Sequence, residues 1–175
     1  DDIRLAGDEL YLTLGAKLEH NDYTGYEVQP SARLRWSPAD GQTLWAAVSR
    51  AVRTPSRGDD GVALGLVALP PRTPANPLPF PALSVFQGDP SFASEALTAY
   101  ELGYRAWPTE RLSLDVTAFY NDYDDLRALE QRNDLVDLEG GYLRDPYLFV
   151  NAQRGQSRGI EIAANWQPAD GWRLQ

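Results

Sequence analysis

Apolar and polar side chains alternate with a period of two along much of this chain. Between residues 9 and 19, every even position is Leu or Ala, while the odd positions hold Glu, Tyr, Thr, Gly and Lys. Residues 26–36 and 111–121 show the same alternation. Because successive side chains of a β-strand point to opposite faces of a sheet, each segment is predicted to be a strand with one apolar face.

Six segments are predicted to be strands: residues 9–19, 26–36, 43–53, 95–106, 111–125 and 148–166. The facing of residues 43–53 stays open, because Arg50 shares its parity with Leu44 and Val48. Neighbours in sequence are expected to pair as neighbours in space. The pattern therefore predicts an all-β fold, an antiparallel meander of about seven long strands.

The connections between these strands are alternately short and long. SPADGQ, WPTER and QPADGW are rich in Pro, Asp and Gly, as hairpin turns are. The segment between residues 53 and 95 holds eight of the thirteen prolines, and a second long segment spans residues 125–147. Within the first, Gly61–Pro70 (GVALGLVALP) is expected to be a mobile apolar loop. Short turns at one end and long loops at the other are typical of an outer-membrane β-barrel.

All tryptophans lie close to the short turns. An indole ring is apolar but its N–H needs a polar partner, so tryptophan prefers the membrane interface. We therefore expect a girdle at one depth of the membrane, and its members are Trp36, Trp45, Trp107, Trp166 and Trp172.

Composition and charge narrow the possible partners. The chain is 43% hydrophobic, and it has no run of 18 apolar residues that would indicate a membrane helix. Its net charge of −9 and its lack of a Lys/Arg cluster argue against binding to nucleic acid. It has no cysteine, which excludes a disulfide scaffold. The chain begins DDIRL with no basic and apolar signal segment, so we expect a fragment or a processed piece.

Several stretches resemble one known family, and together they cover nearly the whole chain. LTLGAKLEHN, LWAAVSRAVRTPSR, SEALTAYELGYR, LSLDVTAFYNDYDDLRAL and QRGQSRGIEIAANWQPADGWRL are similar, in this order, to the C-terminal β-barrel of TonB-dependent outer-membrane receptors. The most specific parts are Ser49–Pro55, Tyr100–Tyr104 and Gly159–Glu161. The resemblance implies a transmembrane barrel of about 22 strands. It also implies uptake of a scarce nutrient, such as a ferric siderophore or cobalamin, with energy supplied through TonB.

The resemblance also implies what surrounds these strands. Residues 1–175 are expected to be an internal portion of the barrel, without the plug domain and without the final barrel strands. The expected partners are outer-membrane lipid, the receptor's own plug domain, TonB through the missing N-terminal region, and a small nutrient or metal chelate. The expected localisation is the outer membrane of a Gram-negative bacterium.

Two groups of charged residues are candidate functional residues. Those on the polar face of the strands are expected to face the lumen and to contact the plug or each other, and they are Arg33, Arg35, Glu101, Arg105, Asp115 and Glu161. Arginines near the long loops are candidates for binding an anionic ligand, because guanidinium groups bind carboxylates and phosphates in a bidentate manner. They are Arg53, Arg57, Arg72, Arg144 and Arg154.

Other interpretations use the same strands. A passive porin-like channel shares the strand pattern, and a soluble β-sandwich binding module or adhesin also has half-apolar strands. We expect no enzyme and no cofactor: His20 is the only histidine, and the nearest serine in sequence is Ser31. The acidic run Asn121–Asp125 suits a hard cation in composition, but it lacks the glycine and glutamate of a calcium loop, so no metal site is expected.

Overall fold

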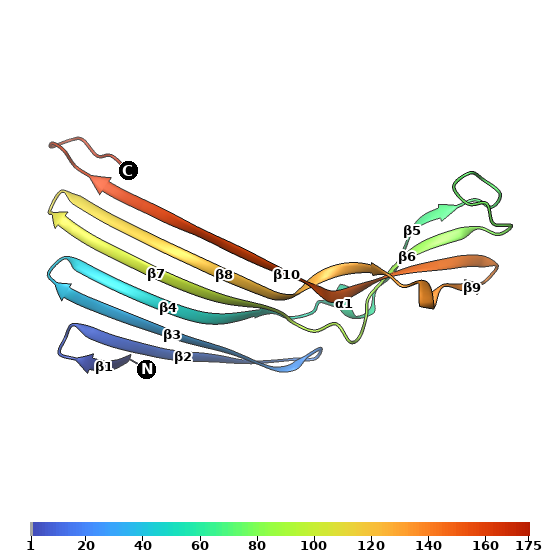
Figure 1. Ribbon diagram of the computed structural model, residues 1–175, viewed down its shortest axis with the longest axis horizontal. Helices are drawn as coiled ribbons and strands as arrows, with labels where there is room; N and C mark the ends of the chain where they lie inside the picture. The colour runs from blue at the N-terminus through green and yellow to red at the C-terminus, as the bar shows by residue number, and fades with distance from the viewer. Residues whose placement is uncertain (1) are drawn as a thin grey trace.

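The computed structural model describes residues 2–175, apart from the side chains at positions 135 and 139. Its main feature is one sheet of long antiparallel strands, which lie side by side from β2 to β10 in Figure 1. The predicted strands are confirmed as β2 (Leu10–Asn21), β3 (Gly25–Ala39), β4 (Gln42–Arg53), β7 (Glu95–Thr109), β8 (Leu112–Gln131) and β10 (Tyr142–Trp166). The short β1 (Asp2–Ala6), which the sequence did not predict, pairs with β2 at the edge.

The strand register separates the sheet into an apolar and a polar face. One row of paired residues on the apolar face runs across six strands through Leu12, Leu34, Ala46, Leu102, Ala118 and Ile160. These side chains are not in a core: Leu102 is 59% exposed and Ile160 is 69% exposed. Large exposed apolar surfaces of this kind require a cover. The register also gives the facing of β4, because Arg50, Leu44 and Val48 all lie on the apolar face.

The apolar face runs obliquely across the sheet. The register connects Trp36 on β3 to Ile162 on β10, which lies four residues before Trp166. If Trp36 and Trp166 lie at the same depth in the membrane, these four residues correspond to an offset of about 13 Å along the strand. The four strand spacings from β3 to β10 add up to about 19 Å, so the strands are tilted by about 35°. That is the tilt of strands in transmembrane barrels, about 35–45°.

The tryptophans lie at the short-turn end of the sheet but not on one face. Trp36 and Trp166 extend the apolar face. Trp45 pairs with Arg35 and Gly103 and lies on the polar face, so its expected place in a lipid-facing girdle is wrong. Its ring covers Gly103, where an added Cβ would lie 2.1 Å from the indole. The distance of a tryptophan from a turn predicts its position along the strand. Whether its residue number is odd or even in the alternating pattern decides which face of the sheet it lies on.

This difference between the tryptophans gives a fluorescence prediction for the full-length receptor in vesicles. In variants that keep one tryptophan each, with the others replaced by Phe, lipids brominated near the headgroup are expected to quench Trp36 and Trp166 strongly and Trp45 weakly. Equal quenching of Trp45 and Trp36 would show that the assignment of faces is wrong.

The proline-rich segment contains regular structure, and Gly61–Pro70, which was expected to be a mobile apolar loop, mostly forms a strand. The segment contains α1 (Arg57–Gly61), β5 (Ala63–Leu69) and β6 (Ala82–Gln87). β6 pairs in parallel with β10, and β5 pairs antiparallel with β6. The strands are possible because all eight prolines lie outside them: six lie between β5 and β6, Pro90 follows β6, and Pro55 precedes α1.

β8 and β10 continue beyond the other long strands, and the extension of β10 pairs with β6 and with β9 (Asp137–Glu139). We call the assembly of β5, β6, β9 and the distal halves of β8 and β10 the distal sheet. It lies at the end opposite the short turns (Figure 1). Val85 and Leu148 are among its buried side chains, Phe92 is buried in the connection from β6 to β7, and the Phe86 ring lies 6.1 Å from that of Phe149. The distal sheet therefore has a small apolar core of its own.

Candidate functional site

The sheet formed by the long strands β2, β3, β4, β7, β8 and β10 bends where the distal sheet begins. Asp125 on β8 has a positive φ of 58°, and β10 has register shifts between residues 151 and 155. Asn151 Nδ2 donates to the backbone oxygens of Asp125, at 2.7 Å, and Ala93, at 3.1 Å. The Ala93 N–H donates back to Asn151 Oδ1 at 2.7 Å. One asparagine thus holds the end of the proline-rich segment against the bend.

Four charged residues connect the two ends of the proline-rich segment with each other and with β8. Arg53 Nε donates to Glu95 Oε2 at 2.5 Å, and Arg127 Nη1 donates to Asp59 Oδ1 at 3.0 Å. Arg53 Nη1 also lies 3.7 Å from Asp59 Oδ2. The Arg127 N–H donates to Glu95 Oε1 at 2.7 Å, so β4, α1, β7 and β8 meet here. We call Arg53, Asp59, Glu95 and Arg127 the ion-pair cluster.

The local sequence explains why Asp59 is fixed at this point. Ser56 caps α1, and Asp59 is its third helical residue, so the two form a capping box. Ser56 donates to Asp59 Oδ2 from its backbone N–H at 2.9 Å and from its hydroxyl at 2.8 Å. Gly88 packs directly on α1, because an added Cβ would lie 2.7 Å from backbone atoms of Asp60 and Gly61. Asp59 is 1% exposed as a result.

The two carboxyl groups of the cluster, Asp59 and Glu95, have lowered pKa values and are ionised at neutral pH. Burial alone would raise the pKa of the Asp59 carboxyl, but hydrogen bonds from Ser56 and Arg127 outweigh it, so this pKa lies below its ordinary value of 3.8. The hydrogen bond from Arg53 lowers the pKa of Glu95 below its ordinary value of 4.5. Two carboxylates and two guanidinium groups leave the cluster with no net charge, so an anion gains little from it without displacing Asp59 or Glu95.

The lowered pKa values predict how the cluster depends on pH. Groups with a depressed pKa stabilise the fold fully above their unfolded values, 3.8 and 4.5, and lose this contribution as pH falls through the lower folded values. Protease resistance of the distal sheet is therefore expected to stay constant from neutral pH to about pH 5 and to fall below about pH 4. In Asp59→Asn it should be reduced already at neutral pH, whereas Asp60→Asn should behave as wild type. A wild-type-like pH profile in Asp59→Asn would contradict the role of the cluster.

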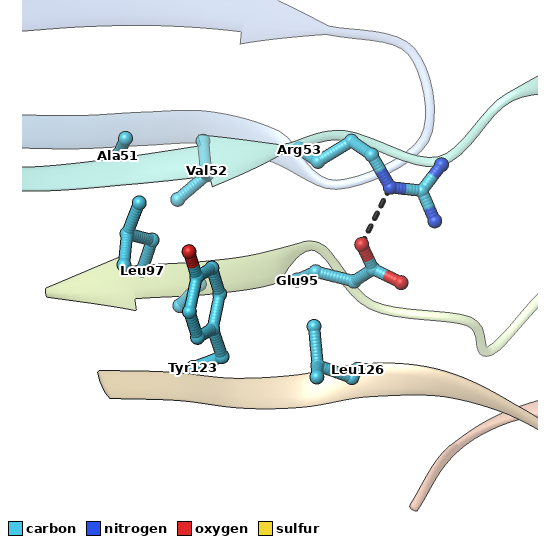
Figure 2. Close-up of a pocket in the computed structure, with 8 residues that line it drawn as sticks. Ala51, Val52, Arg53, Glu95, Leu97, Tyr123 and Leu126 are labelled. Carbon is cyan, nitrogen blue, oxygen red and sulfur yellow. Dashed lines mark hydrogen bonds and ion pairs between the residues drawn. The ribbon is translucent and has the colours of Figure 1, made fainter. Parts of the chain in front are cut away.

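A cavity of about 300 Å³ lies beside the cluster on the polar face. Figure 2 shows the Arg53–Glu95 pair at its edge and Leu97, Tyr123 and Leu126 along its side. The other lining residues are Ala51, Val52 and Ala96. An apolar and aromatic wall with a few polar groups at its edge suits part of a small organic ligand.

The five arginines predicted to bind a ligand do not form one site. Arg53 belongs to the ion-pair cluster, and Arg57 is exposed in α1. Arg72 lies in the β5–β6 connection, with a positive φ of 57°. Arg144 Nη2 donates to Gln87 Oε1 at 2.8 Å within the distal sheet. Arg154 pairs with Asp124 at 3.0 Å on the side that continues the apolar face. Only Arg53 lines the cavity.

Asp59, Glu95 and Arg127 were not among the candidates from the sequence. The one local signal was the capping-box pattern at Ser56 and Asp59, a Ser followed three residues later by an acid. Nothing local indicates that β4, β7 and β8 bring Arg53, Glu95 and Arg127 to the same point.

The six residues predicted to face the lumen all lie on the polar face. Arg105 Nε donates to Asp115 Oδ2 at 2.7 Å. The Arg33 guanidinium lies 5.4 Å from the centre of the Trp45 ring, in cation–π geometry. In the register, Glu101 lies in the row of Arg33, and Glu161 lies in the row of Arg35. Ion pairs and arginine–aromatic contacts thus order this face; its contact with a plug remains a prediction.

Two carboxylates of the acidic run at residues 121–125 have polar side-chain partners. Asp122 accepts a hydrogen bond from Gln156 and Asp124 pairs with Arg154. Over residues 2–175, with the two side chains noted above set aside, no three His, Asp or Glu side chains are grouped to hold a metal ion. Within the same residues, no helix has the length and apolar character needed to span a membrane.

A wall of antiparallel strands with one apolar face, one polar face and short turns at one end is the architecture of a transmembrane β-barrel. The family model described as "TonB dependent receptor-like, beta-barrel" matches residues 1–175, and the chain belongs to this family. Its members are transport receptors, not enzymes, and membership is inconsistent with a soluble β-sandwich. A search of curated proteins gives no match.

Solved structures of siderophore receptors share this fold. A mutant of the ferric enterobactin receptor PfeA from Pseudomonas aeruginosa gives a TM-score of 0.79 at 21% identity, covering 98% of this chain and 24% of that chain. The siderophore receptor PirA from Acinetobacter baumannii gives 0.72 at 17% identity, covering 97% and 25%. The FrpB iron transporter from Neisseria meningitidis gives 0.59 at 14% identity, covering 96% and 22%. The chain therefore spans about a quarter of these receptors.

Proposed function

We propose that this chain is part of a receptor that takes up a ferric siderophore across the outer membrane of a Gram-negative bacterium, with energy supplied through TonB. The observation that carries the proposal is the match of the receptor barrel family to the whole chain. A ferric siderophore is favoured over cobalamin because the similar structures are siderophore receptors, one of them in complex with enterobactin.

The distal sheet is assigned to the extracellular side, since long loops of such barrels lie outside and short turns lie in the periplasm. The cavity beside Arg53 and Glu95 then lies on the lumen side, directly below the distal sheet. A ligand captured by the distal sheet would reach this cavity before it enters the lumen. Leu97 and Tyr123 offer contact to apolar or aromatic parts of the ligand.

The polar face of the sheet supports the next step of uptake, which is passage of the ligand through the lumen. Below the cavity, its side chains include Arg33, Arg35 and Glu101, with the Arg105–Asp115 pair nearer the short turns. We assign this surface to contact with the plug domain of the full receptor. Displacement of the plug through TonB would then expose a polar path past these residues.

Ligand binding to intact cells tests the ligand class directly. Cells that produce the full-length receptor are titrated with a ferric catecholate, a ferric hydroxamate and cobalamin. Leu97→Trp, which fills the cavity, is expected to weaken the affinity for the ferric siderophore at least about tenfold. Tyr100→Trp on the opposite face is the matched control and should bind as wild type. Binding of cobalamin alone, or equal affinity of Leu97→Trp and wild type, would contradict the proposal.

A further inference from the structure

β3 and β4 separate on the side toward the distal sheet. Their ladder runs from the short turn only as far as the pair Ser31 and Ser49. Beyond it lies Pro30, which has no N–H to donate. The carbonyl oxygen of Val28 accepts a hydrogen bond from Arg50 Nη1 at 2.7 Å instead. The Arg50 side chain thus bridges the two strands where backbone pairing stops.

A groove lies at this separation. It has a volume of about 510 Å³, within the range of small-molecule sites of about 300–1,000 Å³. Residues of the apolar face line its sides, and these are Leu14, Pro30, Ala32, Val48 and Thr98. Gly15, Ser31 and Ser49 also line it, at positions whose side chains belong to the polar face. Arg50 lines the end toward the distal sheet. The groove therefore combines an apolar channel with one cationic group.

The hydrogen bond to Val28 does not explain why the side chain at position 50 is charged. A guanidinium has five N–H donors, and a neutral amide would serve one carbonyl equally well. Arg50 lies on the apolar face. Among the residues that the structure describes, the Glu27 carboxylate is under the influence of the Arg50 charge, but its hydrogen bonds come from Ser94 and Thr24: the pKa of Glu27 is lowered chiefly by the bond from Ser94 and to a smaller extent by Arg50. A charge on such a face is costly unless it meets an opposite charge.

The position of Arg50 indicates what supplies that charge. Its row across the sheet continues through Thr98, Asp122 and Gln156, where polar residues replace the apolar ones. Trp36, Trp45 and Trp166 lie near the short turns, at the other end of the strands. Arg50 therefore lies at the edge of the apolar face that is nearer the distal sheet, at the depth of the outer-leaflet headgroups.

We propose that the groove is a lipid site: it holds one acyl chain of an outer-leaflet lipid whose phosphate contacts Arg50. Charge complementarity and the apolar walls favour this occupant over a peptide, whose backbone N–H and C=O groups would need partners that Leu14, Ala32 and Val48 do not offer. The inference rests on the outer-membrane placement proposed above, but it is independent of the transported ligand.

Native mass spectrometry of the full-length receptor, purified in mild detergent and titrated with lipid A, tests the site. Arg50→Gln keeps a donor for Val28 but removes the charge, and Ala32→Phe fills the groove but leaves Arg50 in place. Arg50→Gln is expected to lower the bound fraction of diphosphorylated lipid A about tenfold, a typical effect of losing one charge-assisted contact. Ala32→Phe is expected to lower it as well, because the larger side chain takes the place of the acyl chain. Arg33→Gln on the polar face is the control and should retain lipid as wild type does. Dephosphorylated lipid A should bind wild type and Arg50→Gln equally weakly.

Each outcome decides one part of the proposal. Equal binding of phosphorylated lipid by Arg50→Gln and wild type would overturn the phosphate contact. Equal binding by Ala32→Phe and wild type would overturn the groove, and this variant decides if Arg50→Gln fails to assemble. Siderophore affinity, measured on the same preparations, should stay unchanged in Arg50→Gln and Ala32→Phe. Failure of wild type to bind any siderophore would count against the proposed function and would leave the lipid result readable.

Discussion

Replacing Ile162 by Arg is expected to destabilise the full-length barrel by about 2–4 kcal/mol, the cost of an arginine at the bilayer midplane. Ile162 is 70% exposed and lies midway between Arg158 and Trp166 on β10. At an exposed position in water, the same change would alter stability by only about 0.5 kcal/mol. Urea-induced unfolding of the receptor in phospholipid vesicles measures the difference.

The neighbouring residue provides the matched control. Glu161 lies on the polar face of the same strand, so Glu161→Arg should cost much less than Ile162→Arg. A similar free energy of unfolding for the two variants would mean that lipid does not cover the apolar face.

The second large effect is expected from the distal sheet. Replacing Gly58–Asp89 by a short Gly-Ser turn in the full-length receptor removes Asp59, β5 and β6. The ladders of β4 with β7 and of β7 with β8 remain, so the barrel should still assemble. Ligand affinity on intact cells should fall at least about tenfold, a loss of about 1.4 kcal/mol.

A shorter replacement separates the distal sheet from its tip. Exchanging only residues 71–80 for a Gly-Ser turn keeps β5, β6 and the ion-pair cluster, so a smaller loss of affinity is expected. Folded-barrel mobility on a gel shows whether each variant has assembled. Unchanged affinity in the longer replacement, with normal assembly, would show that the distal sheet is only a cover.

The long strands could be predicted because their period-two pattern is a local property of the sequence. β5 and β6 were missed because the prolines around them suggested a loop, whereas their pairing depends on β10, more than 50 residues away. The facing of β4 could not be predicted because Arg50 is on the apolar face, where it bonds to Val28 across the strand separation.

The candidate site was predictable only in part, for a similar reason. Arg53 was recognised as a cation near a long loop, but its partners Glu95 and Asp59 come from other elements. Exposed arginines such as Arg57 and Arg72 satisfy the same sequence criterion without lining the cavity. The sequence shows which side chains are charged. Which of them come together depends on the strand register and on the path of the loops, which the sequence does not show locally.

Uptake of ⁵⁵Fe-labelled siderophore tests the proposed function most directly. A strain that lacks its own siderophore receptors is complemented with the full-length receptor, and iron accumulation is compared with and without functional TonB. Accumulation that requires both the receptor and TonB is expected, and it should drop when Leu97 is replaced by Trp beside the Arg53–Glu95 pair. Equal accumulation without TonB would identify a passive channel, and no accumulation of any ferric siderophore by an assembled receptor would contradict the assignment of the ligand.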